Sequence, residues 1–302
     1  KHFIDKDDIK SVLSVLKSDF LTQGPKVEEF EKKLKSLFKA KYACCTSSGT
    51  AALHLCGLAL NWKKKHLILA SPLTFVATTN AALYLGAKVD FVDIDKETYN
   101  IDINKLENKL IALKKHKKKV HTLIVTDYAG QPSDWPKLKS LSKKFRFKLI
   151  NDNCHSIGSK IFNDSGYAVK YADLVCHSYH PVKNITTCEG GMTVTNNKEY
   201  YDRMKVFLTH GITRDYKDRE KSASHYYEMV ELGYNYRIPD LLCALGINQL
   251  KKLDKFIKRR QEIAKIYDKK LQQFDNYLVP LTQKFENAYH IYVIKLNLNN
   301  LK

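Results

Sequence analysis

Short apolar runs alternate with amphipathic stretches through the first two thirds of the chain. The runs have the length and bounding residues of buried strands, and they cover residues 42–45, 67–71, 87–92, 123–128, 149–152, 174–178 and 191–195. Apolar residues with helical spacing fill most of the gaps, over residues 50–60, 75–85, 103–113 and 133–147. This alternation predicts an α/β fold with a mostly parallel, seven-stranded sheet, whose ligands bind at the carboxyl ends of the strands.

Further helical patterns flank this region. Residues 5–17 and 27–38 are amphipathic, and the turn between them ends in Gly24-Pro25. After residue 195, helical spacing covers residues 198–208 and 240–274, with a polar, irregular stretch at 210–230 between them. We expect the second of these helices to bend at Lys258-Arg259-Arg260, because these cations interrupt its apolar stripe.

The change of pattern near residue 208 predicts two domains. Residues 1–208 would hold the N-terminal helices and the large domain. Residues 209–302 would hold an interface loop, the long helix and the start of a smaller C-terminal α+β domain, with the run YHIYVIKL at 289–296 as one of its strands. Because one helix and one strand bury little surface, we expect this smaller domain to be incomplete here.

The composition narrows the classes of protein. No run of about 18 apolar residues occurs, so we expect no membrane partner. The net charge of +19 raises nucleic-acid binding as a possibility, but the basic clusters do not interleave with aromatic residues. Charge pattern alone therefore favours solvated surfaces and predicts no nucleic-acid partner. The seven cysteines include no C-x-x-C pair, so we expect no metal site, and free thiols in a cytoplasmic protein.

Residues with catalytic chemistry follow the predicted strands. Asp152 ends one apolar run, Ser178 ends another, and Lys183 follows five residues later. The turn Ser47-Ser48-Gly49-Thr50 and Phe75 each follow a strand and open a helix. Taken singly, each has a simpler explanation: Asp152 as a helix cap, the turn as an N-cap and Phe75 as a core residue. Their order places all of them at one edge of the sheet, which favours a shared site.

One cofactor uses all of these groups together. A helix N-terminus binds a phosphate, and an aromatic ring stacks on a flat heterocycle. A buried carboxylate keeps a pyridine nitrogen protonated, and a lysine forms a Schiff base with an aldehyde. Pyridoxal 5'-phosphate (PLP) requires the four together, so the sequence predicts PLP as the cofactor.

Seven motifs in order carry a resemblance that covers nearly the whole chain. They are FLTQGPKVEEFE (20–31), TSSGTAALHL (46–55), SPLTFVATTNAALYLGA (71–87), DYAGQP (127–132), NDNCHSIGS (151–159), HSYHPVKNITTCEGGM (177–192) and GYNYRIPDLLCALGINQL (233–250). With these motifs the sequence resembles the DegT/DnrJ/EryC1/StrS family of sugar aminotransferases, which are fold-type I PLP enzymes. The resemblance implies that fold for this chain.

The resemblance also implies roles around the cofactor. Lys183 would be the catalytic residue and would carry PLP as a Schiff base. Asp152 would pair with the pyridinium nitrogen, His155 would contact the side of the phenolic oxygen, and Phe75 would stack on the ring.

Other implied roles concern the phosphate, the second subunit and the sugar. The phosphate would be bound by Gly49, Thr50 and Ser178. Asn235, in GYNYR, would reach the phosphate from the second subunit of a homodimer with shared active sites. The sugar pocket would be lined by Phe20, Leu21 and Thr22. A plain helix–helix turn ending in Gly24-Pro25 is the alternative reading of that last stretch.

The implied reaction moves an amino group from L-glutamate to C4 of a nucleotide-linked 4-keto-6-deoxy sugar. HPVKNITT and DYAGQP resemble the subgroup that makes UDP-4-amino-4,6-dideoxy-N-acetyl-β-L-altrosamine on the route to pseudaminic acid. The alternatives are GDP-perosamine or dTDP-4-amino-sugar synthesis, and a PLP-fold regulator without turnover. Lys183 disfavours the regulator, since silent relatives often lose this lysine, and it disfavours the related 3-dehydratases, which carry histidine there.

One residue departs from the family pattern. Cys188 stands where relatives usually have glycine, so a left-handed backbone at this position would be strained.

Overall fold

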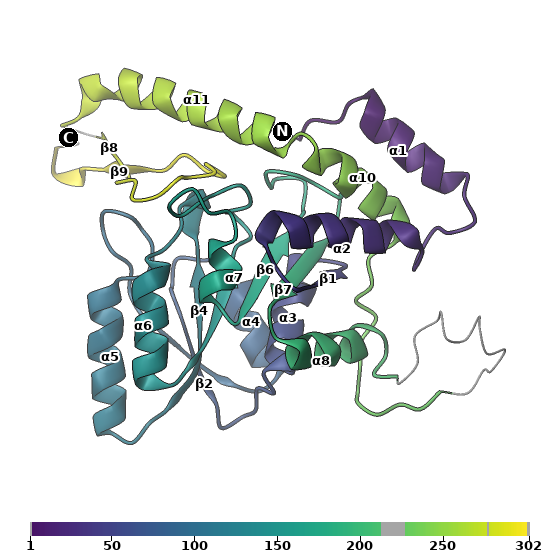
Figure 1. Ribbon diagram of the computed structural model, residues 1–302. Helices are drawn as coiled ribbons and strands as arrows, with labels where there is room; N and C mark the ends of the chain where they lie inside the picture. Colours follow the sequence, from purple (N-terminus) through teal and green to yellow (C-terminus); the bar gives the residue numbers. More distant parts are fainter. Residues whose placement is uncertain (1, 213–226, 277, 301–302) are drawn as a thin grey trace.

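A computed structural model describes residues 2–212, 227–276 and 278–300 (Figure 1). Its main sheet has seven strands in the order β1-β7-β6-β5-β4-β2-β3. Their bounds are Tyr42–Thr46, Leu67–Ala70, Lys88–Phe91, Val120–Thr126, Lys148–Asp152, Leu174–Ser178 and Gly191–Thr195 for β1 to β7. Strand β7 runs antiparallel to β1 and β6, and the other neighbours are parallel. The α/β prediction with a mostly parallel seven-stranded sheet is confirmed.

Helices cover both faces of the sheet. One face packs against α3 (Gly49–Ala59), α4 (Ala77–Tyr84) and α8 (Lys198–Leu208), and the other against α2 (Pro25–Phe38), α5 (Ile103–Lys115), α6 (Trp135–Phe145) and α7 (Tyr167–Tyr171). Side chains alternate between the two cores along the central strands: in β4, Leu123 and Val125 face one core, while Ile124 faces the other. This double burial explains why the strands read as continuous apolar runs.

The N-terminal helix pair is held by α10 (Asp240–Leu250). Helix α1 (Lys6–Leu16) packs on α10, and α2 begins at a glycine N-cap that offers no side chain. Asp240 supplies the missing cap, because its buried carboxylate accepts hydrogen bonds from the N–H groups of Gly24 (2.7 Å) and Lys26 (2.8 Å). The turn between α1 and α2 is therefore fixed by a residue more than 200 positions later.

The predicted long helix is two helices, and the predicted bend was wrong. Helix α10 ends at Leu250, α11 runs from Leu253 to Leu271, and the chain turns at Lys251-Lys252. The ammonium of Lys252 lies 2.8 Å from Asp5 and also contacts the fully buried Asp8, which anchors the turn to α1. The cations at 258–260 do not break α11, because Arg260 donates to the carbonyls of Tyr289 (3.0 Å) and His290 (3.2 Å) and its two neighbours face solvent.

The C-terminal strand is shorter than the sequence pattern indicated. Strand β9 covers only Ile294–Leu296 and pairs with β8 (Leu278–Pro280), while residues 289–293 are irregular. The irregularity has a local cause, since the carbonyls of Tyr289 and His290 bond to Arg260 and not to a strand. Figure 1 shows α11 and this small sheet above the main sheet. The proposed division at residue 208 stays a prediction.

The structure also bears on the expectations about the cysteines, about membrane spans and about the polar stretch after residue 208. All seven cysteines are free, although Cys188 is exposed and Cys154 is partly exposed. Within the described residues, no helix is long and apolar enough to cross a membrane. Most of the polar stretch predicted at 210–230 lies outside the described residues.

Candidate active site

A cavity of about 320 Å³ lies at the carboxyl ends of β4, β5 and β6. Seven of the predicted site residues line it: Gly49, Thr50, Phe75, Asp152, His155, Ser178 and Lys183. They lie at or after the carboxyl ends of four strands, β1, β2, β5 and β6, and the common direction of these strands brings them together at one edge.

The N-terminus of α3 forms one wall of the cavity. Ser48 is the N-cap, and its hydroxyl accepts a hydrogen bond from the N–H of Ala51 at 3.1 Å. The N–H groups of Gly49 and Thr50 open the helix, so no carbonyl lies one turn earlier to receive them. A Cβ at Gly49 would lie 2.8 Å from the Cβ of Ser178, so only glycine permits this close approach. The wall is suited to an anion such as a phosphate.

Asp152 lies at the floor of the cavity at the end of β5, and it is 4% exposed. Its Oδ2 accepts a hydrogen bond from the hydroxyl of Thr78 at 2.6 Å, and its Oδ1 accepts one from the N–H of Cys154 at 3.3 Å. The hydroxyl of Thr74 in turn lies 2.7 Å from those of Thr78 and Thr126. This threonine chain orients the carboxylate, and the sequence interpretation missed it. Its only sequence signal is the repeated threonine in SPLTFVATT and at the end of β4.

A neighbouring buried network holds the loop that carries Asp152. Asp127, from the DYAGQP motif, does not line the cavity. Its carboxylate accepts hydrogen bonds from five donors between 2.8 and 3.1 Å: Ser133 N, Trp135 Nε1, Asn151 Nδ2, Asn153 Nδ2 and Tyr167 OH. Two of these donors flank Asp152 in the chain, so the network fixes the backbone on both sides of it.

Lys183 lies on the loop after β6 and is half-buried. The backbone positions it: its N–H donates to the carbonyl of His180 at 2.9 Å, and the side chain of Asn184 donates to the carbonyl of Ile157 at 3.1 Å. Its ammonium has no hydrogen-bond or ion-pair partner in the described part of the chain. A lysine positioned by its backbone with an unpaired amine is available to a ligand in the cavity.

Two histidine rings pack together beside this lysine. The rings of His155 and His290 are 4.4 Å apart between centroids and tilted by 32°. Burial, and secondly the positive charge of Lys183, lowers the pKa of His155 to about 4. Burial also lowers the pKa of His290, to about 2. Both rings are therefore neutral at pH 7, and neither Nδ1 has a partner among the described residues.

His290 was not among the predicted site residues. It belongs to the C-terminal segment and lines a second hollow that also contains Lys183. Its sequence signal was the AYHIYV run, which we interpreted as a strand.

Four predicted site residues lie outside the cavity. Asn235 is exposed and forms an isolated bridge with Thr209. The others, in the turn between α1 and α2, are also exposed: Phe20, Leu21 and Thr22. None of the four lines the cavity formed by the described residues of this one chain, so their predicted roles stay predictions.

Cys188 has the left-handed backbone that its position suggested. Its φ is +65°, and its N–H donates to the hydroxyl of Thr186 at 3.0 Å. The expected strain at this non-glycine residue is therefore present in the loop after Lys183.

Comparisons with known proteins agree with this site. The model of the DegT/DnrJ/EryC1/StrS aminotransferase family matches residues 2–301. The chain is 42% identical, over 97% of its length and 74% of the relative, to a UDP-4-amino-4,6-dideoxy-N-acetyl-beta-L-altrosamine transaminase of Campylobacter jejuni.

Solved structures agree as well. The aminotransferase PseC of Helicobacter pylori, involved in the biosynthesis of pseudoaminic acid, superposes with a TM-score of 0.87 at 32% identity, over 99% of this chain and 77% of that one. A sugar aminotransferase of Streptococcus pneumoniae in its PLP form has a TM-score of 0.86 at 25% identity, over 98% and 77% of the two chains.

Proposed function

Because the chain belongs to the DegT/DnrJ/EryC1/StrS aminotransferase family, we propose that its cavity holds PLP and that the protein aminates a nucleotide-linked sugar. The amino group would come from L-glutamate and would go to C4 of a UDP-linked 4-keto-6-deoxy sugar, on the route to pseudaminic acid. The observation that carries the proposal is a convergence on one cavity. An unpaired lysine amine, a buried carboxylate and an open helix N-terminus all face the same space of about 320 Å³.

The residues present fit PLP. The N–H groups at the start of α3 and the hydroxyls of Thr50 and Ser178 would hold the phosphate. Asp152 would hold the ring nitrogen in its protonated form, and Phe75 would lie over the ring. When bound, PLP supplies an electron sink for the charge that develops when the Cα–H bond of an amino acid breaks.

The chain's own groups would do the proton chemistry. The Nζ of Lys183 is the base that would take the Cα proton and later return it, because no other described side chain with a free amine lines the cavity. Asp152 keeps its orientation through Thr78, so its charge stays directed at one position. The low pKa of His155 keeps its ring neutral, and an N–H of the neutral ring would donate to the phenolic oxygen.

The UDP-linked sugar is the finer part of the proposal. It is supported by the 42% identity to the Campylobacter jejuni transaminase and by the likeness to the Helicobacter pylori aminotransferase. The turn at Phe20, Leu21 and Thr22 would contact the sugar. Phe20 and Leu21 are exposed in the single chain, so they are accessible to a ligand or to a second subunit.

A homodimer would complete the site. Exposed apolar side chains lie just before α4, at its end and on residues 227–232: Phe75, Val76, Leu83, Tyr84, Met229 and Leu232. Tyr84, at the end of α4, and Tyr234, two residues after this second stretch, both contact the ring of His54, with centroids 5.4 Å and 4.9 Å away. Apolar surface of this kind marks a contact with another protein, and Asn235 lies beside it.

Stopped-flow absorbance of the PLP-loaded protein tests the proposal. L-glutamate alone should convert the cofactor in the first half-reaction. In the second half-reaction, a UDP-linked 4-keto-6-deoxy sugar should restore it faster than the GDP- and dTDP-linked sugars. Faster restoration by either of these would contradict the choice of nucleotide. No conversion with L-glutamate or any other amino acid would overturn the function.

A further inference from the structure

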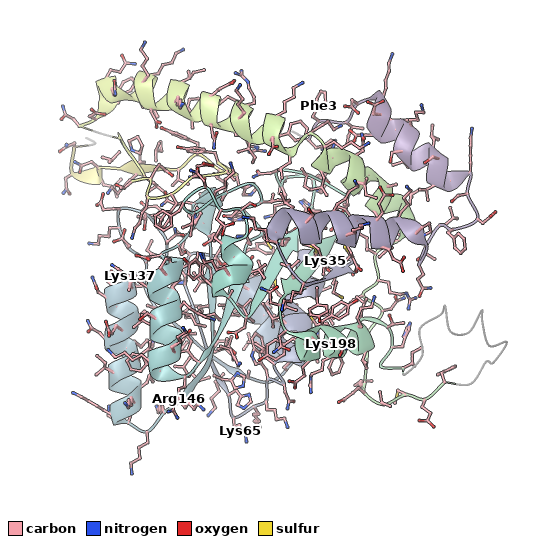
Figure 2. All side chains as sticks on the ribbon, viewed as in Figure 1. Phe3, Lys35, Lys65, Lys137, Arg146 and Lys198 are labelled. Atoms are coloured by element: carbon pink, nitrogen blue, oxygen red, sulfur yellow. The ribbon has the colours of Figure 1, made fainter. Side chains whose placement is uncertain are left out.

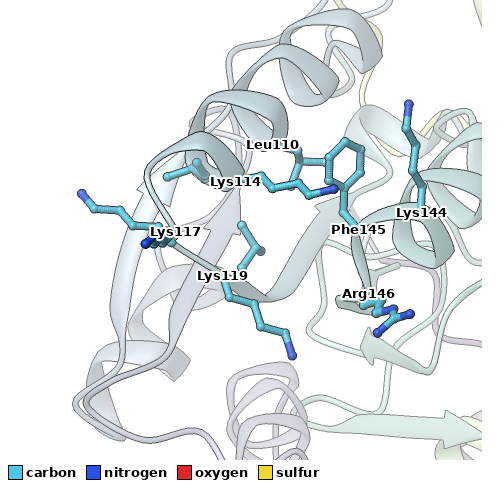
Figure 3. A pocket seen from close by; sticks show the side chains of 10 residues that line it. Leu110, Lys114, Lys117, Lys119, Lys144, Phe145 and Arg146 are labelled. Atoms are coloured by element: carbon cyan, nitrogen blue, oxygen red, sulfur yellow. The ribbon is translucent and has the colours of Figure 1, made fainter.

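A third hollow lies at the opposite end of the strands from the candidate active site (Figure 3). Its volume is about 530 Å³, and it lies where α5 and α6 end and β4 begins. Four apolar residues form part of its wall: Leu110, Leu113, Val120 and Phe145. The remaining lining residues are all cationic: Lys114, Lys117, Lys118, Lys119, Lys144 and Arg146.

Few carboxylates offset the positive charge of these six cations. Lys144 forms an ion pair with Glu107 at 2.7 Å, but the other five have no ion pair within the described residues. No carboxylate is among the described residues that line the hollow. All six cations are exposed, and like charges that line one hollow repel each other, so an anionic ligand would relieve the repulsion.

Helix capping explains only part of this cluster. Lys114 and Lys144 lie in the last turns of α5 and α6, where a cation stabilises the carbonyl end of a helix. Arg146 is the C-cap residue of α6, and the other three lysines lie beyond the C-cap of α5, His116. Lys117 and Arg146 even have positive φ angles of 55° and 59°, a conformation in which glycine is usual after a helix. The charges of the three lysines beyond the cap of α5 therefore need an explanation other than the helix ends.

The cations approach from two sides. Lys117, Lys118 and Lys119 come from the connection between α5 and β4, and Arg146 comes from the connection between α6 and β5. Figure 3 shows the side chains of Lys119 and Arg146 extending toward the same side of the hollow. Figure 2 shows Arg146 and Lys65 on the same edge of the molecule.

We propose that this hollow binds an anion that carries two or more adjacent phosphate groups. Several phosphates match cations that approach from two sides, and the volume falls in the usual range of roughly 300–1,000 Å³ for small-molecule sites. The phosphates could belong to a free polyphosphate or to the headgroup of an anionic lipid. Nucleic acid fits less well, because Phe145 is the one aromatic ring in the lining and the ammonium of Lys144 lies 5.4 Å from its centroid.

The test measures binding of inorganic tripolyphosphate by calorimetry at about 0.15 M salt, a concentration that screens distant charges. Excess PLP is present, so that the phosphate position at α3 is filled. One variant combines Lys117→Gln, Lys119→Gln and Arg146→Gln. The matched control removes the same charge from exposed positions of α11 with Lys255→Gln, Lys258→Gln and Lys265→Gln. A second arm measures co-sedimentation with vesicles that contain phosphatidylinositol 4,5-bisphosphate, whose headgroup carries neighbouring phosphates, and with phosphatidylcholine vesicles.

The expected result is a Kd for tripolyphosphate that rises about tenfold or more in the hollow variant and stays within about twofold in the control. Vesicle binding that the hollow variant loses, and that tripolyphosphate competes away, would identify a lipid headgroup as the source of the phosphates. Equal weakening in both variants would overturn the proposal, because it would mean diffuse surface charge. Failure of the wild-type protein to bind either probe would also overturn it, as would tighter binding of duplex DNA that depends on the hollow.

Discussion

The hydroxyl of Thr78 lies 2.6 Å from the Oδ2 of Asp152, and both groups are buried at the floor of the candidate active site. This hydrogen bond joins the start of α4 to the end of β5. It fixes the direction of the carboxylate that would hold the ring nitrogen of PLP. Removal of this hydrogen bond should therefore weaken the binding of PLP more than it lowers the stability of the fold.

Thr78→Val should raise the Kd for PLP by about 10- to 100-fold, since a hydrogen bond to a charged group contributes roughly 1.5–3 kcal/mol. The measurement is a titration of the apo-protein with PLP, followed by absorbance. Thr79→Val is the matched control, because among the described residues the hydroxyl of Thr79 bonds only to the carbonyl of Val76, at 3.3 Å. Unchanged PLP affinity in Thr78→Val would show that the hydrogen bond does not orient Asp152.

Stability should fall in mild acid because of His177. Burial lowers the pKa of this fully buried ring to about 3, and neither ring nitrogen has a partner among the described residues. The unfolded chain binds a proton near pH 6.5, so stability is present above that pH and is lost as the pH falls toward the folded value. Between pH 7 and pH 5 the loss from this residue should be about 2 kcal/mol.

Urea unfolding at the two pH values checks this. His177→Phe should reduce the pH dependence, because the new ring can keep the stacking with Phe38, whose centroid is 4.2 Å away. His116→Phe, at an exposed position, is the control and should leave the pH dependence unchanged. If the stability of His177→Phe depends on pH as that of the wild type does, the acid-induced loss of stability does not come from His177.

Cys188→Gly should stabilise the protein. The left-handed backbone costs a non-glycine residue roughly 1–2 kcal/mol, and the added freedom of glycine in the unfolded chain takes back about 0.4–1 kcal/mol. The net gain should be about 1 kcal/mol in urea unfolding. Cys188→Ala keeps the strain and should show no gain; an equal gain in both variants would assign the effect to the thiol.

Shared active sites predict complementation between two inactive chains. Lys183→Ala lacks the amine in the cavity, and Asn235→Ala lacks the group proposed to reach the phosphate of the partner subunit. Heterodimers of the two should recover part of the activity, because one of their two sites has both residues. Proven heterodimers without any activity would mean that Asn235 does not act across the interface.

Strand order explains why so much of the site could be predicted. Asp152, Ser178 and Lys183 follow consecutive parallel strands, so their place at one edge depends only on the alternation of strands and helices. Contacts between segments far apart in the sequence leave no comparable pattern in the sequence. The break after Leu250 depends on Lys252 meeting Asp5 and Asp8, and the packing of His290 on His155 depends on how the C-terminal segment crosses the sheet. The bend predicted at 258–260 failed for the same reason.

The central claim is that the amine of Lys183 is the attachment point for PLP. The most direct measurement is borohydride reduction of the PLP-loaded protein, followed by digestion and mass spectrometry. We predict that the yellow absorbance disappears and that the added mass is found on the peptide with Lys183. Lys183→Ala should keep its far-UV circular dichroism but should show neither the label nor transamination. A label on another lysine, or full turnover by Lys183→Ala, would contradict the account.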